Sequence, residues 1–499
     1  MPLMIRFLFL AHRYVGIALG LVVSLWCLSG FVMMYVQYPR LDAGEQAAGL
    51  ARLDLDDCCR MPNVLGNLAL DRFRLEMLTG RPVMRLFHGR AQTVVDLQAG
   101  EVLGDVDAAQ ARAIAASAAQ AYGLEGALTL EGAIERDQWT VYGSYHPHRP
   151  LYHFTVDDPP GTEFYISSTT GEVVQMTTAN VRFWNWMGSV VHWLYPTVLR
   201  QHTAVWVQAV IWLTIVSLFL TVVGIYIAIR QFRFRRKGRK SPYRGWTLWH
   251  HYAGLLFGLF TLTWLVSGLF SMNPWGALEG RSFALEDQRL RGGELDLDRT
   301  RTLARSISGR VMSGAVRIDG AMVGGELTLV ATTAEGGRTR LASDLRTVDA
   351  LPERFFAAAP ALMRPDVPVR QSGWLPEGDA YYFSHHAKRR FPVYRIEYED
   401  GERLYLDSVS GELAFAVDSE RQWMRWVFHA LHRGDFSTLF RSRPLWDLMM
   451  WPLLLGVTVG SLTGTWIGIR RVVRWAAKPR RNPFNAVPEL RSKEQRIEA

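Results

Sequence analysis

The chain has 499 residues, 49% of them hydrophobic and 21% charged, and a formal net charge of +9. The charge is unevenly spread: four long stretches are almost free of it, which excludes a simple cytosolic globule, a disordered chain and a fibrous protein. Three cysteines are too few for a disulfide framework or for the usual cysteine-ligated zinc or iron–sulfur site. The composition therefore indicates a membrane protein with two polar segments.

The four apolar stretches each have about 20 residues or more, enough for a helix to cross a bilayer. The first is longer than the apolar core of a signal peptide, so we expect it to be a retained span. The sequence predicts the following order: a span in 1–38, an outer domain in 39–182, an interfacial segment in 183–202, a span in 203–230, a basic loop in 231–248, a span in 249–273, an outer domain in 274–422, an interfacial segment in 423–444, a span in 445–470 and a tail in 471–499.

Basic residues cluster directly after the second and fourth spans, in 230–244 and 470–481. The positive-inside rule places such clusters in the cytoplasm, together with both chain termini. The two large polar segments then lie outside, in the periplasm if the membrane is the inner membrane of a Gram-negative bacterium. The positive charge is therefore explained by topology, and we expect lipid and not nucleic acid as its partner.

Comparison of the sequence with itself reveals an internal repeat. The segment HRYVGIALG at 12–20 returns as HHYAGLLFG at 250–258, and GIYIAIR at 224–230 returns as GTWIGIR at 464–470. In the polar segments, FYISSTTGE at 164–172 matches LYLDSVSGE at 404–412. Since both halves start inside, the repeats are parallel and related by an axis along the membrane normal.

The expected fold is a four-span α-helical bundle with two extracytoplasmic α+β domains, arranged as a tandem parallel repeat. In the first domain we predict a helix over 108–122 and strands over 139–142, 151–156, 163–167 and 172–176. In the second we predict a helix near 301–308 and strands over 381–384, 393–398 and 403–407.

The spans with His-x3-Gly-x3-Gly, the stretch WHHYAGLLFGLF at 249–260 and the Tyr-x-(Ile/Leu) hairpins ending in Gly-Glu resemble the PepSY-associated transmembrane proteins of bacterial inner membranes. The resemblance covers nearly the whole chain. It implies electron transfer, because the family includes haem-containing ferric-siderophore reductases. Other PepSY proteins are thought to inhibit peptidases or to regulate envelope proteins, and the resemblance allows that function too.

Two histidines begin the first and third spans, and ionisable groups near hydrocarbon are functional candidates. His12 forms one helical stripe with Gly16 and Gly20, and His250 forms another with Gly254 and Gly258. A histidine above two glycines offers an axial nitrogen and a wall without side chains for a flat macrocycle. We therefore predict that His12 and His250 ligate a haem b iron. His251 could replace His250, and the glycines could equally serve close helix packing.

At the outer surface, VVHWLY at 190–195 matches VFHALH at 427–432, which pairs His192 with His429. We expect these two histidines to ligate a second haem. The repeat requires neither His432 nor His202, but either could be the ligand if this site departs from the repeat. Two haems at opposite depths would divide the electron path across the bilayer into shorter steps. Arg200 and Asp447, close to span ends, could balance haem propionates.

Other groups with possible chemistry lie in the polar segments. Five histidines there could gather a metal, although solvated loop histidines are commoner: His146, His148, His153, His385 and His386. Cys58 and Cys59 could form a disulfide between neighbours, and a capped or intermolecular state is equally open; Cys27 is expected to pack inside the first span.

The sequence contains no dinucleotide or phosphate-binding loop, no zinc-protease motif and no nucleophile elbow. Electrons would therefore come from quinol or from a cytoplasmic reductase. We expect a haem-dependent oxidoreductase that reduces a periplasmic ferric chelate or ferric siderophore. The alternatives are a non-enzymatic PepSY module that binds or regulates envelope proteins such as peptidases, and a transporter of small solutes or metals.

Overall fold

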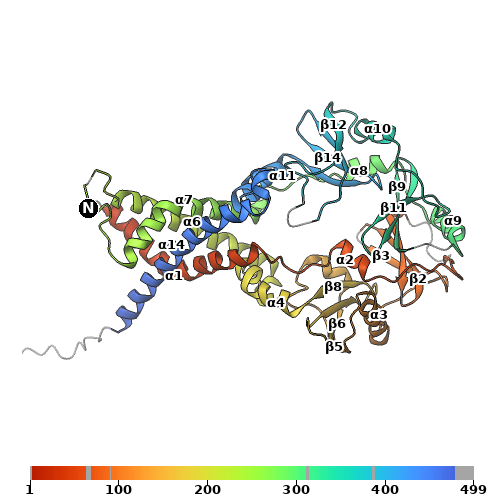
Figure 1. Ribbon diagram of the computed structural model, residues 1–499, viewed down its shortest axis with the longest axis horizontal. Coiled ribbons are helices and arrows are strands. Elements are labelled where there is room, and N and C mark those ends of the chain that lie inside the picture. Colours follow the sequence, from red (N-terminus) through yellow and green to blue (C-terminus); the bar gives the residue numbers. More distant parts are fainter. Residues whose placement is uncertain are drawn as a thin grey trace, which may run out of the picture. The chain divides into compact units, whose positions relative to one another are not determined.

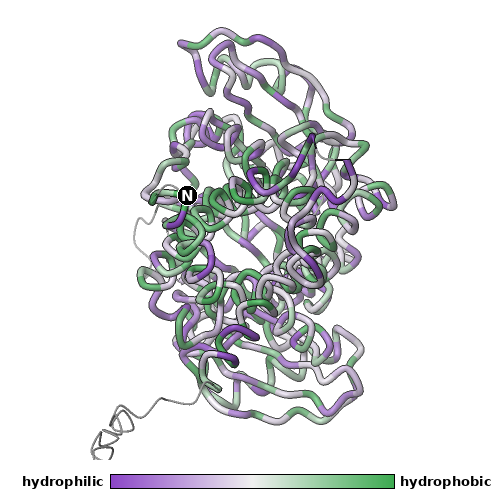
Figure 2. The backbone as a smooth tube through the Cα atoms, turned by 90° about the vertical axis from the view of Figure 1, so that its left-hand side faces the viewer, coloured by the Kyte–Doolittle hydropathy of each residue, from purple (hydrophilic) through white to green (hydrophobic). Residues whose placement is uncertain are grey.

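The computed structural model describes residues 3–62, 69–89, 91–235, 237–310, 314–384 and 388–477. Four of the helices in these residues are long and apolar enough to cross a membrane: α1 (Leu3–Met33), α6 (Thr203–Gln231), α7 (Trp246–Ser271) and α14 (Leu445–Ala476). They confirm the four predicted spans (Figure 1). Figure 2 shows that hydrophobic residues dominate the helix that begins at the N-terminus. Most of the predicted tail and part of the basic loop lie outside the described residues.

The chain forms two compact units. The first unit contains the segments 1–24, 219–261 and 455–499, and it therefore holds one end of each long helix. The second unit contains 25–218 and 262–454, which include the other ends of these helices and all of the β-structure.

Small residues bring the helices of the first unit close together. A Cβ added to Gly20 would lie 2.9 Å from Thr465 Oγ1, and one added to Gly258 would lie 2.9 Å from Ile225. Ser24 Oγ and Thr465 Oγ1 are hydrogen-bonded at 2.9 Å. Close packing at small residues and hydroxyl hydrogen bonds are typical of helix contacts in membranes.

The second unit contains two small α+β modules. In the first, α3 (Ala108–Ala121) packs its alanine-rich face on the antiparallel sheet β5-β6-β7-β8. In the second, α10 (Glu353–Met363) packs on the sheet β12-β13-β14-β15. The strands are β5 (Leu128–Ile134), β6 (Leu151–Val156), β7 (Glu163–Ser167), β8 (Val173–Thr177), β12 (Val369–Leu375), β13 (Val393–Tyr398), β14 (Arg403–Asp407) and β15 (Leu413–Val417).

Several predictions for these modules were wrong. A strand was expected over 139–142, but these residues form turns around the side chain of Asp137, and the first strand of that sheet is β5. The first strand of the second sheet is β12. Asp379 likewise caps the backbone N–H groups of Tyr381 and Tyr382, where a strand was expected. The helix near 301–308 exists as α9 (Leu297–Ile307), but α10 is the helix that covers the second sheet.

A seven-stranded sheet joins the two polar segments. Its order is β11-β10-β9-β1-β2-β3-β4, and β1 pairs with β9 in antiparallel fashion, with Leu75 opposite Ile318. One face packs with α9 in a core that also contains the disulfide between Cys58 and Cys59. The strands are β1 (Arg72–Leu78), β2 (Arg81–His88), β3 (Ala91–Asp96), β4 (Glu101–Val102), β9 (Ala315–Val323), β10 (Glu326–Thr333) and β11 (Arg338–Leu341).

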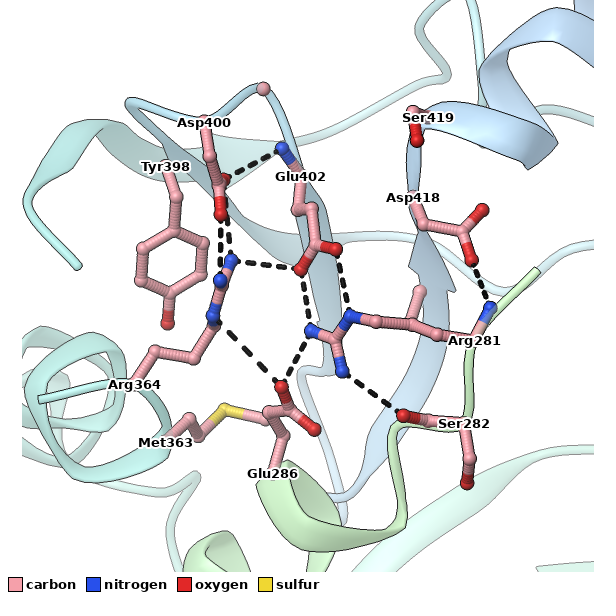
Figure 3. A network of polar contacts seen from close by, with 12 residues as sticks. Arg281, Ser282, Glu286, Met363, Arg364, Tyr398, Asp400, Glu402, Asp418 and Ser419 are labelled. Carbon is pink, nitrogen blue, oxygen red and sulfur yellow. Dashed lines mark hydrogen bonds and ion pairs between the residues drawn. The ribbon is translucent and has the colours of Figure 1, made fainter. Parts of the chain in front are cut away.

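A polar network ties the second module together (Figure 3). Arg281 precedes α8 (Ala284–Arg291) and contacts Glu286 at 2.6 Å and Glu402 through two of its nitrogens. Arg364, at the end of α10, binds Asp400 at 2.6 Å and Glu402 at 2.8 Å. Two arginines thus meet three carboxylates, although Glu286 Oε2 is buried without a hydrogen-bond partner.

The two segments that lead from the modules to α6 and α14 are built alike. Each contains a short helix followed by one π-helical turn: α4 (Ala179–Asn185) and η3 (Trp186–Val190), then α11 (Ser419–Met424) and η5 (Arg425–Ala430). The second segment continues through α12 (Leu431–Arg433). Short π-helical stretches occur frequently at functional sites.

Candidate functional site

In the first unit, His12 on α1 faces His250 on α7. The centroids of the two imidazole rings are 6.2 Å apart, and the ring planes are tilted by 37°. His12 Nδ1 lies 3.1 Å from the carbonyl oxygen of Leu220, and His250 Nδ1 lies 2.9 Å from that of Gly460. A carbonyl oxygen can only accept, so each Nδ1 carries the proton and donates it. Each Nε2 is left with a lone pair that can bind a metal.

A glycine of another helix lies directly against each of these imidazoles. A Cβ on Gly224 would lie 2.7 Å from His12 Cε1, and a Cβ on Gly464 would lie 2.8 Å from His250 Cε1. Such distances are too short for ordinary packing, so only glycine fits at either position without a shift of the ring. Sequence reasoning did not assign these glycines to the site. The signal was present, because each glycine opens one of the two repeated segments that end in Ile-Arg.

The glycine stripes beside the histidines divide into two kinds. Gly20 and Gly258 are filled by Thr465 and Ile225, as described for helix packing. Gly16 has only Leu220 at 3.7 Å, and nothing lies within 4 Å of the Cβ position of Gly254. Of the four glycines, only Gly254 therefore faces the open space predicted for a flat group, and Gly16 is in ordinary van der Waals contact with Leu220.

His251 differs from its neighbour His250. Its side chain is buried, its Nδ1 is 2.7 Å from Ser241 Oγ, and its Nε2 is 2.8 Å from the carbonyl oxygen of Ala228. Both ring nitrogens are thus used by the protein. His251 therefore has no ring nitrogen left with which to replace His250 as a ligand.

In the second unit, His192 faces His432, with ring centroids 6.1 Å apart and ring planes at 76°. His192 Nδ1 is 3.1 Å from both the carbonyl oxygen of Trp26 and the hydroxyl of Ser29. His432 Nδ1 is 3.0 Å from the hydroxyl of Ser267, which itself donates to the carbonyl oxygen of Trp264. The carbonyl of Trp26 therefore fixes the proton on His192 Nδ1, the serine hydroxyl accepts from His432 Nδ1, and each ring keeps a lone pair on Nε2.

The partner of His192 is therefore His432 and not His429, which the sequence comparison had paired with it. Two local features show that His192 and His432 occupy equivalent positions in their segments. Leu194 and Gly434, two residues after each histidine, have positive φ values of 51° and 69°. Trp206 and Trp446 donate their indole N–H groups to the carbonyl oxygens one residue after each histidine.

The other histidines proposed as ligands occupy different positions. His429 lies within the π-helix η5, and its ring is next to Phe428 at 5.3 Å. His202 is exposed just before α6. The similarity of VVHWLY and VFHALH is therefore out of register with the structure by three residues.

The histidines of the polar segments do not form a metal site in the described part of the chain, where no group of three or more ligating side chains occurs. His148 contacts Ser167 and Thr170, and His153 stacks on Tyr165 and lies 3.2 Å from Glu163. Both histidines thus contact the sheet of the first module. His385 and His386 lie outside the described residues.

Comparison with known proteins gives one match. The model of the PepSY-associated TM region matches residues 9–295, more than half of the chain, including both helices that carry the facing His12 and His250. None of the curated proteins matches the sequence. The match and the four spans together show that the chain is a multi-pass membrane protein that belongs to the PepSY-associated TM region family.

Proposed function

We propose that the protein is a membrane oxidoreductase that holds one haem b at each histidine pair and passes electrons outward to a ferric chelate. The observation that carries the proposal is common to both pairs. Each pair consists of two imidazoles with Nδ1 fixed by a backbone carbonyl or a serine hydroxyl and with ring centroids 6.2 or 6.1 Å apart.

This arrangement fits two imidazoles on one iron. Imidazole nitrogens bind a metal at about 2 Å, so the centroids of two rings on opposite sides of it are about 6 Å apart. Hydrogen bonds at the other ring nitrogen are what ligating histidines ordinarily have, because they fix the tautomer and the orientation of the ring.

Haem iron would supply one-electron transfer at each pair, since it alternates between the ferric and ferrous states. The chain itself holds and orients the imidazoles. Gly224 and Gly464 let His12 and His250 lie against α6 and α14, and the hydroxyls of Ser29 and Ser267 fix His192 and His432.

The topology gives the proposal a direction. The basic clusters that begin at the ends of α6 and α14 support a cytoplasmic position for these helix ends, so the β-rich segments would be periplasmic. The donor would be quinol or a cytoplasmic reductase. The acceptor follows from the resemblance to ferric-siderophore reductases: reduction releases the metal, because hard oxygen ligands suit Fe(III) better than Fe(II). We further propose that the halves arose as a tandem parallel repeat, which would explain why two pairs are built alike.

The test is the absorption spectrum of the full chain, purified in lipid nanodiscs after expression with added haem precursor. We expect a Soret band that shifts on reduction with dithionite, and about two haems per chain. A ferrous-specific chromophore should then report iron release from an added ferric chelate. A colourless protein that also takes up no haem on reconstitution would contradict the proposal. His202→Ala serves as the control, because His202 is exposed and belongs to neither pair.

A further inference from the structure

A buried cluster of charges lies next to His432. Arg425 and Asp435 are almost inaccessible, with exposures of 4% and 0%. Arg425 Nη2 contacts Asp435 Oδ1 at 3.2 Å, and Arg441 Nε contacts the same oxygen at 2.7 Å. One carboxylate oxygen thus receives two arginines, both held in the segment that positions His432.

The cluster is not balanced. Arg425 Nη1 and Asp435 Oδ2 are buried without a hydrogen-bond partner. Arg433 follows His432 directly and lies over the ring of Phe428 at 5.0 Å, and no carboxylate among the described residues is within ion-pair distance of it. The next carboxylate, Asp379, accepts from Tyr405 and from Arg395. Three arginines therefore accompany one carboxylate, Asp435, which pairs with Arg425 and Arg441.

Two comparisons describe this excess. In the network of Figure 3, two arginines meet three carboxylates, so the excess charge there is negative and not positive. The segment that carries His192 has Trp193 at the position of Arg433 and Tyr195 at that of Asp435, and these rings pack with Tyr38 and Trp206. That segment also carries a cation without an ion pair among the described residues, Arg200, but Arg200 stacks on Tyr195 and Trp206 and lies farther along the chain from its histidine, whereas Arg433 directly follows His432.

Arg433 is partly buried and makes no ion pair among the described residues, and a cation withdrawn from water without an anion is costly, so this place favours an anion that arrives from elsewhere. Arginine binds carboxylates with charge-assisted and often bidentate hydrogen bonds. A lipid phosphate offers the same charge, but Arg425 is too buried to meet the membrane surface. The two residues first expected to balance propionates are already engaged. Arg200 stacks on Tyr195 and Trp206, and Asp447 pairs with Arg443.

We propose that Arg433, which lies over the Phe428 ring that stacks on His432, forms together with Arg425 of the same segment the binding site for the carboxylates of a haem held by His192 and His432. This inference rests on the proposed function and adds the acid-recognition residues of one site. It predicts that the outer haem is recognised through its propionates from one side only, the side of the second segment.

The test compares two porphyrins on one protein. Full-length chain carrying His12→Ala and His250→Ala, so that only the outer pair remains, is stripped of haem and reconstituted in nanodiscs with iron protoporphyrin IX or its dimethyl ester. Haem loss to apomyoglobin is followed for the parent, for Arg433→Gln and for Arg443→Gln. Arg443 is the matched control, because it lies just before α14 and already has Asp447 as a partner at 3.3 Å.

We expect Arg433→Gln to release native haem about tenfold faster, the effect of one lost charge-assisted hydrogen bond, and to release the dimethyl ester at the parental rate. Arg443→Gln should change neither rate. Equal acceleration for both porphyrins, or none for either, would overturn the inference while leaving the histidine ligation intact. An effect that appears only with anionic lipids would also overturn it, in favour of a phosphate site. A parent that binds neither porphyrin would instead contradict the proposed function.

Discussion

The two histidine pairs have nearly equal ring separations but are built from different structures. His12 and His250 lie within regular membrane helices, and each imidazole rests on a glycine of a neighbouring helix. His192 and His432 lie after π-helical turns, and each is hydrogen-bonded to a serine hydroxyl of α1 or α7. The pair of His12 and His250 depends on glycines that have no side chain, and the pair of His192 and His432 depends on hydrogen bonds with serine hydroxyls.

The two pairs also differ in how alike the surroundings of their members are. His12 and His250 lie in long helices, and each contacts one glycine and one backbone carbonyl. His192 and His432 lie in connecting segments, where Trp193 and Tyr195 follow the first histidine and Arg433 and Asp435 follow the second. The same imidazole geometry is thus supported by two unrelated kinds of surroundings.

The largest expected effect separates His432 from His429. His432→Ala removes an imidazole that faces His192 and should lower the haem content of the purified chain by about half. His429→Ala should leave it unchanged, because that ring lies next to Phe428 and not opposite His192. Haem per protein, measured as the pyridine haemochromogen, gives the answer. Loss of haem from His429→Ala and retention in His432→Ala would restore the pairing that the sequence suggested.

The next effect concerns only the first pair. Gly224→Ala places a methyl group 2.7 Å from His12 Cε1 and should displace the ring, with about tenfold weaker retention of one haem. The haem at His192 and His432 should be unaffected, as judged by separate electron paramagnetic resonance signals. Gly456→Ala is the control, since its methyl group would meet Phe257 and no histidine. If both substitutions weaken the same haem equally, the glycine contact is ordinary helix packing.

The smallest effect concerns the outer pair. Ser267→Ala removes the hydroxyl partner of His432 Nδ1, so about a fivefold faster haem loss is expected, the size of one net hydrogen bond. Ser24→Ala, which removes a hydroxyl bonded to Thr465 in the first unit, should not change this rate. A larger effect from Ser24→Ala than from Ser267→Ala would show that the serines act through helix packing.

The sequence predicts the parts that follow a regular period. Hydropathy locates the four spans, and the repeated His-x3-Gly pattern by itself selects His12 and His250 as candidate ligands. The same repeat contains Gly224 and Gly464, but their contact with the rings is visible only in three dimensions, because contacts between helices leave no mark within either helix alone.

The remaining features were hidden by a local similarity or depend on long-range structure. The flanking matches, 164 with 404 and 224 with 464, are both 240 residues apart, and the same offset pairs His192 with His432; the similarity around His192 and His429 departs from this offset by three residues and hid that partner. The seven-stranded sheet could not be predicted either, because β1 and β9 come from distant segments without visible similarity. Helix α10 was missed because it contains Pro360, which ordinarily indicates the end of a helix.

The pairing of β1 with β9 also constrains how the protein can be assembled in the cell. Ribosomes deliver the first polar segment well before the second, so β1 must wait with an open hydrogen-bonding edge until β9 arrives. Unpaired edges invite wrong partners, and the interval between the two segments is when a nascent chain is most exposed to aggregation or proteolysis. Neither half is a self-sufficient domain, and slowing synthesis between Arg244 and Ala315 should lower the yield more than slowing it after Val323.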